Sequence, residues 1–490
     1  MSSRSMPQLF RPPRRPGNLS TLLKSVLLGM ALAAVSACAH RQLQPDLRRL
    51  YQSANLAAEQ PPLIVIPGIM GSKLRDKATS QVVWPGSLAK LLTSRFDALA
   101  LEIDARTLHG SPGNLEAFDV TDTAAGIDFY ERIVQTLVQH GDFIRTAAGT
   151  RVTDAFERHL YVFPYDWRQD NVETAGKLAA LIEQIRADYG RPDLKVDIVA
   201  HSMGGIVSRY FMRYGTADAL DRDDVAPTMA GANRINRLIL LGTPSLGSAS
   251  TIRALIEGEK VVRTIAPETL ATLPSIYQLL PNSARKPLLG IDGRPLRVSF
   301  EDGASAERDV FDIATWRDLQ WGVFDPEIMV RIRQTATAAG KDGAAQVGLL
   351  QRYFARYLQR AGRLQKALSA PQPDSPVKLI VFGADCTLTP ARVLVENDNG
   401  RWAPRYLASE IKNPMPGRPY DMLLVEPGDG RVGKPSLLGR QSLDPTVNST
   451  TRGGFPIAFS FFLCEAHDQI PGNINFQDNL LNALLSRDAG

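Results

Sequence analysis

The sequence predicts an α/β fold, a mostly parallel central sheet with helices on both faces, interrupted by an inserted and largely helical cap. Between residues 61 and 245, short apolar runs that end in glycine alternate with amphipathic helical patterns, which is typical of parallel strands covered on both faces. That rhythm stops over 246–372 and returns over 373–490, so one core is interrupted and then completed. At 490 residues and 44% hydrophobic content, the chain is large enough to bury such a core.

The first 37 residues have the pattern of an export signal. They carry five cations and no acids, followed by an apolar run over 25–34 that is too short to span a bilayer comfortably. The Val-Ser-Ala-Cys that follows at 35–38 resembles the bacterial lipobox, whose cysteine is lipidated. We therefore expect a signal peptide over 1–37, a lipidated Cys38 and a tether over 38–60, with an outer-membrane address. Plain secretion, with a cysteine near the cleavage site, is the alternative.

The overall charge gives no case for a nucleic-acid partner. The formal net charge is +5, but the five N-terminal cations account for all of it and leave 51 basic against 51 acidic residues. The spacings His-Glu-x-x-His and Cys-x-x-Cys are missing from the sequence, and no glycine-rich phosphate loop opens a helix, so we expect no metal and no cofactor. The two cysteines beyond Cys38, Cys386 and Cys464, could pair in an oxidising compartment, and the sequence leaves that open.

The elements of the first core part, 61–245, follow from their apolar periodicity. A strand over 61–66 enters a turn bounded by Gly68 and Gly71, and residues 72–125, which lack clear periodicity, are predicted to form a lid-like loop region. The later elements are, in order, a helix over 129–138, a strand over 161–163, a helix over 178–189, a strand over 196–201 followed by a helix, and a strand over 237–241.

The inserted segment 246–372 is mostly helical in pattern. Its last helix, over 347–368, is apolar along one side and basic around the rest. The cations are Arg352, Arg356, Arg360, Arg363 and Lys366. A cap helix with a solvated basic face is favoured over a helix that lies on a membrane surface, although both would have this pattern. In the second core part, 373–490, we expect apolar strands that begin near 377, 422 and 457.

The stretch 196–210 predicts a nucleophilic serine. Apolar β-formers lead into Ala200-His201-Ser202-Met203-Gly204, and an amphipathic run follows. A strand-to-helix turn of this kind holds the serine in a strained conformation and lifts its hydroxyl clear of the sheet. It needs small residues on either side of the serine, because the strand and helix backbones nearly touch there. An ordinary strand-to-helix turn is the alternative interpretation.

The partners of Ser202 follow from chain order. A serine nucleophile needs a base and a carboxylate that orients the base, and in this class of sheet the acid and then the histidine follow the serine. Of six histidines only His467 lies after residue 201, so His467 is the predicted base. Asp429 is the favoured acid because it follows an apolar strand and so faces the same sheet edge. Asp385 is the main alternative, and Asp468 is disfavoured because it adjoins the histidine.

Several motifs occur in a fixed order over about residues 60–470. They are Pro67-Gly68-x-x-Gly71, Pro164-Tyr165-Asp166-Trp167-Arg168, Ala200-His201-Ser202-Met203-Gly204, Leu241-Gly242-Thr243-Pro244, Gly428-Asp429-Gly430-x-Val432 and the late His467. In this order they resemble the lecithin:cholesterol acyltransferase and lysosomal phospholipase A2 family. The resemblance implies an α/β-hydrolase core with a cap and a triad of Ser202, Asp429 and His467. It also implies an oxyanion hole formed by the backbone amides of Met203 and Ile69.

The resemblance extends to a tryptophan in the region 72–125. Trp84 resembles a lid tryptophan that contacts lipid in the family. The family's lid is closed by a disulfide, whereas no cysteine lies near Trp84 in this sequence. Residue 69, which follows the Pro-Gly pair, is an apolar isoleucine that can contribute its backbone amide and no polar side chain.

Together these features lead us to expect a serine-dependent lipid acyl hydrolase or O-acyltransferase acting on ester lipids, phospholipid or acylglycerol, at a membrane surface. Hydrolysis and transfer are not distinguished, because that choice depends on which acceptor the cap admits. A carboxylesterase for small soluble esters is the alternative among enzymes. A lipoprotein that binds lipid without catalysis is the alternative from another class.

Overall fold

The computed structural model describes residues 44–51, 59–121, 123–124, 127–128, 130–154, 156–223, 226–299, 305–441, 443 and 456–486. The chain divides into a short unit, 1–46, and a large unit, 47–490, to which all features below belong. The predicted signal peptide and Cys38 lie outside the described residues. Among the helices that are described, none has both the length and the apolar character needed to cross a membrane.

A seven-stranded sheet forms the centre of the large unit, and its strands all run parallel. In spatial order the strands are β23 (Phe459–Leu463), β18 (Lys378–Ala384), β12 (Ile235–Leu241), β11 (Val196–His201), β1 (Leu63–Ile66), β10 (Arg158–Val162) and β9 (Phe143–Arg145). The predicted α/β class with a parallel sheet is confirmed.

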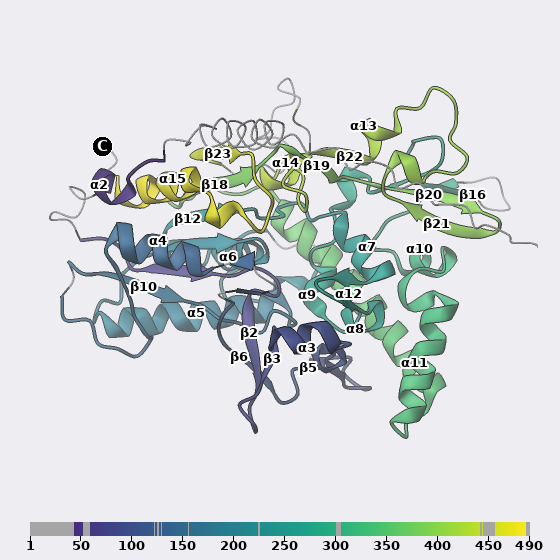
Figure 1. The fold of residues 1–490 in the computed structure, drawn as a ribbon, viewed down its shortest axis with the longest axis horizontal. Helices are drawn as coiled ribbons and strands as arrows, with labels where there is room; N and C mark the ends of the chain where they lie inside the picture. The colour runs from purple at the N-terminus through teal and green to yellow at the C-terminus, as the bar shows by residue number, and fades with distance from the viewer. Residues whose placement is uncertain are drawn as a thin grey trace, which may run out of the picture. The chain divides into compact units, whose positions relative to one another are not determined.

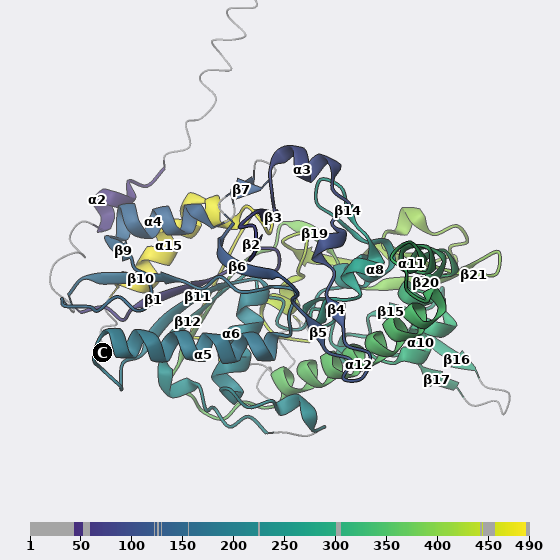
Figure 2. The same cartoon turned by 90° about the horizontal axis from the view of Figure 1, so that it is seen from below.

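Helices cover both faces of this sheet, as Figures 1 and 2 show. On one side lie α2 (Leu47–Tyr51), α4 (Glu131–Gly141) and α15 (Ile474–Leu485), and on the other lie α5 (Asn171–Asp188) and α6 (Met203–Tyr214). Side chains alternate between the two cores: Leu63 and Val65 pack with the first group, and Ile64 and Ile66 with the second. Because both faces of the central strands are buried, these strands are largely apolar, which is why the sequence revealed them.

The strand register brings three loops to one edge of the sheet. Ile66 is aligned with Ala200 across β1 and β11, and His201 is aligned with Leu241 across β11 and β12. The chain therefore leaves all three strands at the same level, through loops that begin at Pro67, Ser202 and Gly242. Carboxyl ends of parallel strands are where open α/β sheets bind their ligands.

The region 72–125 is not a loop throughout, as the sequence led us to expect. It contains a small antiparallel sheet of β2 (Ser72–Asp76), β3 (Val82–Trp84) and β6 (Leu115–Val120), with α3 (Leu88–Thr93), β4 (Glu102–Ile103) and β5 (Gly110–Ser111) around it, and β7 (Thr123–Ala124) and β8 (Ile127–Asp128) follow. These strands are too short to show a clear alternation in the sequence. The region is tied to the core where Trp167 Nε1 donates to Ser72 O over 3.1 Å.

The segment 246–372 is largely helical. Its elements are α7 (Ser250–Glu257), β13 (Glu259–Lys260), β14 (Thr264–Ile265), α8 (Pro267–Leu270), α9 (Pro274–Tyr277), β15 (Leu288–Leu289), β16 (Arg297–Ser299), β17 (Ser305–Glu307), α10 (Ile313–Asp318), α11 (Pro326–Ala338) and α12 (Gly343–Ser369). Strand β15 pairs with β20 (Val393–Asp398), which in turn pairs with β21 (Arg401–Arg405). A later part of the chain therefore packs with this segment (Figure 1).

Helix α12 joins the cap to the core rather than presenting a free basic face. Its apolar side is buried, and Arg360 forms ion pairs with Asp170 at the start of α5 and with Asp218. Arg363 pairs with Asp223 at 2.8 Å, and Arg356 donates to Thr107 O at 2.8 Å. The favoured cap-helix interpretation agrees with this packing, but much of the basic side is engaged with neighbouring elements instead of being solvated.

The prediction of a strand that begins near residue 422 is wrong for its first residues. Residues Tyr420–Leu424 form helix α13, and only Val425–Gly428 form a strand, β22. This strand pairs antiparallel with β19 (Thr387–Pro390) and is not part of the central sheet. Tyr420 and Leu424 lie one helical turn apart and are both buried in a small separate cluster, which explains the helix. Helix α14 (Lys434–Leu437) follows.

Candidate active site

Ser202 occupies the sharp turn between β11 and α6. Its backbone has φ 52° and ψ −122°, a strained conformation for a residue with a side chain, and its amide donates to Leu241 O over 2.8 Å. The neighbours must be small: a β-carbon added at Gly204 would lie 2.5 Å from Pro67 O, and one at Gly68 would lie 2.7 Å from Ser202 Cβ. The sequence thus permits the turn because glycines stand where backbones approach closely.

Asp429 and His467 are joined by a short hydrogen bond although 38 residues separate them. His467 Nδ1 lies 2.7 Å from Asp429 Oδ2, and the backbone amide of His467 donates to Asp429 O over 2.9 Å. The second carboxylate oxygen, Oδ1, accepts from the amides of Arg431 at 2.9 Å and Val432 at 2.7 Å. Asp429 is 1% exposed. This carboxylate is therefore fixed through both oxygens and orients the imidazole.

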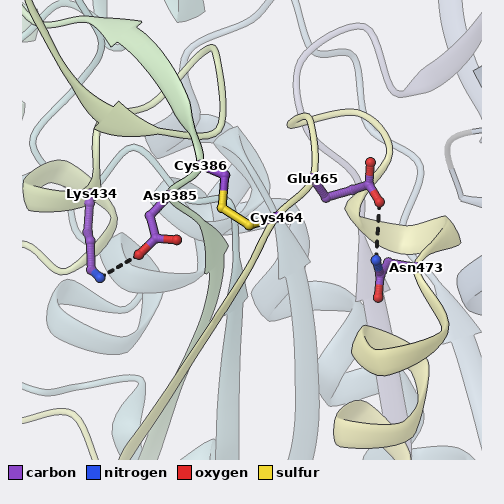
Figure 3. Close-up of a disulfide and its surroundings, with 6 residues drawn as sticks. All are labelled: Asp385, Cys386, Lys434, Cys464, Glu465 and Asn473. Carbon is purple, nitrogen blue, oxygen red and sulfur yellow. Dashed lines mark hydrogen bonds and ion pairs between the residues drawn. A yellow bond between two sulfur atoms is a disulfide. The ribbon is translucent and has the colours of Figure 1, made fainter.

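Neither alternative acid is hydrogen-bonded to His467 in the structure. Asp385 forms an ion pair with Lys434 at 2.6 Å, beyond the end of β18 (Figure 3). Asp468 lines the pocket beside His467, but the ring nitrogen of His467 is bonded to Asp429. Among the three candidate acids, the structure joins Asp429 to the predicted base.

Asp429 raises the pKa of His467. Burial alone would lower the pKa of His467, but the negative charge of Asp429 and its hydrogen bond outweigh burial and hold this pKa above its ordinary value of 6.5. The neighbouring His201 has no such carboxylate, and burial followed by the proximity of His467 lowers the pKa of His201 well below its ordinary value. The pKa values of His467 and His201 are therefore shifted in opposite directions.

Ser202 and His467 open onto one pocket. Both side chains line it, and within the described residues no hydrogen bond yet joins the serine hydroxyl to the histidine ring. Such bonds are often long in unliganded enzymes and tighten when substrate binds. The loop after β12 supports the ring from the other side, since a β-carbon at Gly242 would lie 3.1 Å from His467 Cε1.

The pocket is mostly apolar with a charged rim. Apolar side chains from the turn after β1 and from the cap line most of it, among them Ile69, Met70, Ala254, Val261, Ile276 and Leu279. Charged residues at the pocket are Glu259, Lys260, Arg431 and Asp468, and Arg431 pairs with Glu259 at 2.8 Å. Such a lining suits a ligand with a long apolar part and a polar group near the serine.

The backbone amides of Met203 and Ile69, the predicted oxyanion donors, belong to segments that adjoin Ser202. Met203 is the first residue of α6, and the amides of a helix's first turn have no partner within the helix. Ile69 lines the pocket in the turn after β1, and that turn touches Ser202 through Gly68. Neither amide donates to another described residue, so both are available to an oxygen at the serine.

Trp84, the predicted lid residue, is buried at the pocket wall. It is 2% exposed, and its indole Nε1 donates to Met70 O over 2.8 Å. Its ring packs edge-on against Phe96 and Trp167. Trp84 therefore reaches the pocket from the small sheet of the region 72–125.

A disulfide joins Cys386 to Cys464 beside the site (Figure 3). Cys386 follows β18 and Cys464 follows β23, so the bond ties the ends of two neighbouring strands. His467 lies three residues beyond Cys464. The bond therefore anchors the loop that carries the histidine.

The structure adds Tyr130 and His201 to the site, and the sequence analysis did not identify either as a functional residue. The Tyr130 hydroxyl lies 2.8 Å from His201 Nδ1, and the Gly68 amide donates to it over 2.7 Å. The only signal in the sequence was the position of His201 directly before Ser202. Nothing marked Tyr130, which precedes α4 by one residue. Within the described parts of the chain, no group of three or more metal-ligating side chains comes together.

Part of this chain is similar in sequence to known proteins. A model of the lecithin:cholesterol acyltransferase family matches residues 113–289. Lysosomal phospholipase A and acyltransferase of Bos taurus is 26% identical over 294 residues, which is 52% of this chain and 69% of the relative. Phosphatidylcholine-sterol acyltransferase of Oryctolagus cuniculus is 25% identical over 241 residues, which is 42% of this chain and 48% of the relative.

The family model matches less than half of the chain and the relatives are about a quarter identical, so the chain is similar to lecithin:cholesterol acyltransferases and lysosomal phospholipases A over part of its length. The chain spans about half of the length of most relatives it matches, and somewhat more of the bovine one. A chain in the crystal structure of the Tle4-Tli4 complex has a TM-score of 0.50 at 14% identity, covering 87% of this chain and 98% of that chain. At this identity the likeness concerns the fold alone.

Proposed function

We propose that this protein is a serine-dependent lipid acyl hydrolase or O-acyltransferase that works through an acyl-enzyme on Ser202. One observation carries the proposal: His467, which is hydrogen-bonded to the buried Asp429, lines a mostly apolar pocket together with Ser202. Lipid esters fit this lining, and the similarity to this family favours the same class of substrate. The proposal assigns the base to His467 and the orienting carboxylate to Asp429.

In the first half of the reaction, Ser202 Oγ attacks the ester carbonyl while His467 Nε2 takes the serine proton. The carbonyl oxygen becomes an oxyanion, which the amides of Met203 and Ile69 stabilise by hydrogen bonds. The ester C–O bond then breaks, and His467 returns the proton to the leaving alcohol. Asp429, hydrogen-bonded to His467 Nδ1, stabilises the imidazolium that exists between these two proton transfers.

In the second half, water or an alcohol attacks the acyl-enzyme. His467 removes the proton of the incoming hydroxyl and returns it to Ser202 Oγ as the new product leaves. The choice between hydrolysis and transfer depends on which acceptor reaches the pocket. Elements of the segment 246–372 line that pocket, through α7, β13 and α9, so we assign acceptor selection to this cap.

We also propose that acyl chains on Cys38 hold the protein at the bacterial outer membrane, because the sequence before it has the lipobox pattern. A tether beside lipid would raise the local concentration of substrate. Cys38→Ala should release the protein from membranes into the soluble fraction during cell fractionation. A variant that stays with membranes would contradict the tether.

Product analysis tests the proposed reaction. Wild type and Ser202→Ala are incubated with phosphatidylcholine vesicles, with and without a long-chain alcohol. We expect wild type to release fatty acid, or to form the fatty ester of the alcohol, and Ser202→Ala to yield neither. Fatty acid alone identifies a hydrolase, and a transferred ester identifies an acyltransferase. Equal product from both proteins would overturn the role of Ser202.

A further inference from the structure

The peptide bond between Pro67 and Gly68 is held from both sides by buried tyrosines. Tyr165 donates its hydroxyl proton to Pro67 O over 2.8 Å, and the Gly68 amide donates to the Tyr130 hydroxyl over 2.7 Å. Both atoms of one peptide unit are therefore fixed. The next peptide unit along the chain carries the Ile69 amide, which the proposed mechanism aims at the oxyanion.

The turn needs this support because of its composition. Glycine has more backbone freedom than any other residue, so Gly68 on its own would not hold the Ile69 amide in one direction. The Tyr130 ring also packs on the far end of the turn, where a β-carbon at Gly71 would lie 2.6 Å from Tyr130 Cε2. One side chain thus contacts both ends of the turn. The Gly71 amide, in addition, donates to Gly68 O over 3.1 Å.

Tyr130 connects this turn to the residue before the nucleophile. Its hydroxyl lies 2.8 Å from His201 Nδ1, and both residues are buried. The ring of His201 lies 4.8 Å from that of His467, between centroids. Burial raises the pKa of Tyr130, so its hydroxyl stays protonated and neutral. The chain of contacts runs from the oxyanion turn through Tyr130 and His201 to the histidine base.

We infer that Tyr130 and His201 are positioning residues that hold the oxyanion turn and the serine in register for catalysis. Both residues line the pocket beside Ser202, and the proposed mechanism assigns neither of them a bond to the reacting atoms. Tyr130 fixes the orientation of the Ile69 amide through Gly68, and His201 ties Tyr130 to the end of β11, from which Ser202 projects. This inference rests on the proposed function, because it needs an oxyanion to form at Ser202.

A variant that lacks only the tyrosine oxygen separates positioning from packing. Tyr130→Phe keeps the ring against Gly71 and removes the hydroxyl. Tyr210→Phe is the matched control, since Tyr210 is also buried and its hydroxyl also has two hydrogen-bond partners, donating to Ala217 O and accepting from the Ala219 amide, but it does not line the pocket. The two variants should lose similar stability in thermal unfolding.

The expected kinetic effect differs between them. Misplacing an oxyanion donor raises the barrier of the chemical step and leaves substrate binding intact, so Tyr130→Phe should lower kcat roughly 10- to 100-fold with little change in KM. A long-chain trifluoromethyl ketone forms an oxyanion on the serine, so Tyr130→Phe should bind it more weakly, by a factor similar to the loss in kcat. A matching ether forms no oxyanion, so Tyr130→Phe should bind it as tightly as wild type does. Tyr210→Phe should behave like wild type in all three measurements.

Substitutions of His201 test the connection to Tyr130. His201→Asn keeps a polar atom near the Nδ1 position, and His201→Leu removes it. We expect His201→Leu to lose as much kcat as Tyr130→Phe and His201→Asn to lose much less. The double variant of His201→Leu and Tyr130→Phe should be no worse than either single variant, because both break the same link.

The outcomes are distinct from those that test the proposed function. If Tyr130→Phe keeps the kcat of Tyr210→Phe, or if its loss lies in KM alone, the positioning role is wrong while the serine mechanism stands. Independent, multiplying losses in the double variant would also overturn it. If instead wild-type turnover does not depend on Ser202, the proposed function itself fails.

Discussion

Replacing Asp429 by asparagine should disable His467 without disturbing the fold. The side chain is held through Oδ1, which accepts hydrogen bonds from the amides of Arg431 and Val432. An asparagine must keep its carbonyl oxygen there, because an NH2 group cannot accept those bonds. Its NH2 group then faces His467 Nδ1 and donates to it. This forces the proton of His467 onto Nε2, the nitrogen that must accept the proton of Ser202.

The size of the effect follows from this change of tautomer. An asparagine that enforces the wrong tautomer of a triad histidine lowers kcat by about 10⁴-fold, or about 5.4 kcal/mol in the barrier. We expect a loss of that order for Asp429→Asn, with KM nearly unchanged because the pocket wall is intact. Thermal unfolding should shift only slightly, since the variant keeps the two amide hydrogen bonds.

The pH profile provides a second measure of the same interaction. The base must be neutral to accept a proton, so kcat/KM should rise as the pH increases through the pKa of His467. The charge of Asp429 holds that pKa above 6.5, so the wild-type midpoint should lie above 6.5. In Asp429→Asn the charge is gone and the residual activity should have its midpoint at lower pH.

The assay is initial-rate hydrolysis of a long-chain p-nitrophenyl ester by wild type, Asp429→Asn and Asp385→Asn. Asp385 pairs with Lys434 and not with the histidine, so Asp385→Asn is the matched control and should stay within about threefold of wild type. A variant Asp429→Asn with more than a tenth of wild-type kcat would refute the reasoning. Equal losses in both variants would do the same.

Two further predictions concern stability. The Cys386–Cys464 bond closes a loop with a sequence separation of 78 residues. On a chain-entropy model, replacing both cysteines by alanine should therefore lower the free energy of unfolding by about 4.5 kcal/mol. Denaturant titration measures this change, and an unchanged unfolding midpoint would contradict the prediction. Gly205→Ala would place a β-carbon 2.0 Å from Thr243 Oγ1 and should cost about 1–3 kcal/mol or more. Gly176 lies in helix α5 with open space around it, so Gly176→Ala should raise the free energy of unfolding by up to about 1 kcal/mol. Equal shifts in Tm for Gly205→Ala and Gly176→Ala would refute the packing argument.

Much of the fold was predictable because the central strands are buried on both faces. The strands β1, β11, β12 and β18 each contain at least three consecutive apolar residues, and such a run can be recognised in the sequence without knowledge of its neighbours. The edge strand β9 has only Phe143, Ile144 and Arg145, of which just the first is buried, so no pattern announced it. Short strands in the region 72–125 escaped notice for the same reason.

The error near residue 422 has a different origin. Met422, Leu423, Leu424 and Val425 form an apolar run that suits a strand or a buried helix equally, and periodicity cannot separate the two over so few residues. The tertiary partner decided it: Leu424 packs in a small cluster away from the central sheet. Local pattern alone could not reveal that cluster.

Within the site, the order of residues along the chain identified the candidate base and acid, whereas contacts between residues far apart in the sequence could not be predicted. His467 was identified because no other histidine follows the serine, and a carboxylate after a strand pointed to Asp429. The choice of Asp429 over Asp385 needed the structure, which shows where each carboxylate ends. Tyr130 lies 71 residues before His201, and only the fold brings them together.

The most direct test of the central claim is covalent trapping of the nucleophile. A long-chain p-nitrophenyl phosphonate should react with wild type, release one p-nitrophenolate per chain and leave a phosphonyl group that peptide mass mapping assigns to Ser202. Ser202→Ala should not be labelled, and Asp429→Asn should be labelled far more slowly than Asp385→Asn. Labelling at another residue, or equal labelling of Ser202→Ala, would contradict the account.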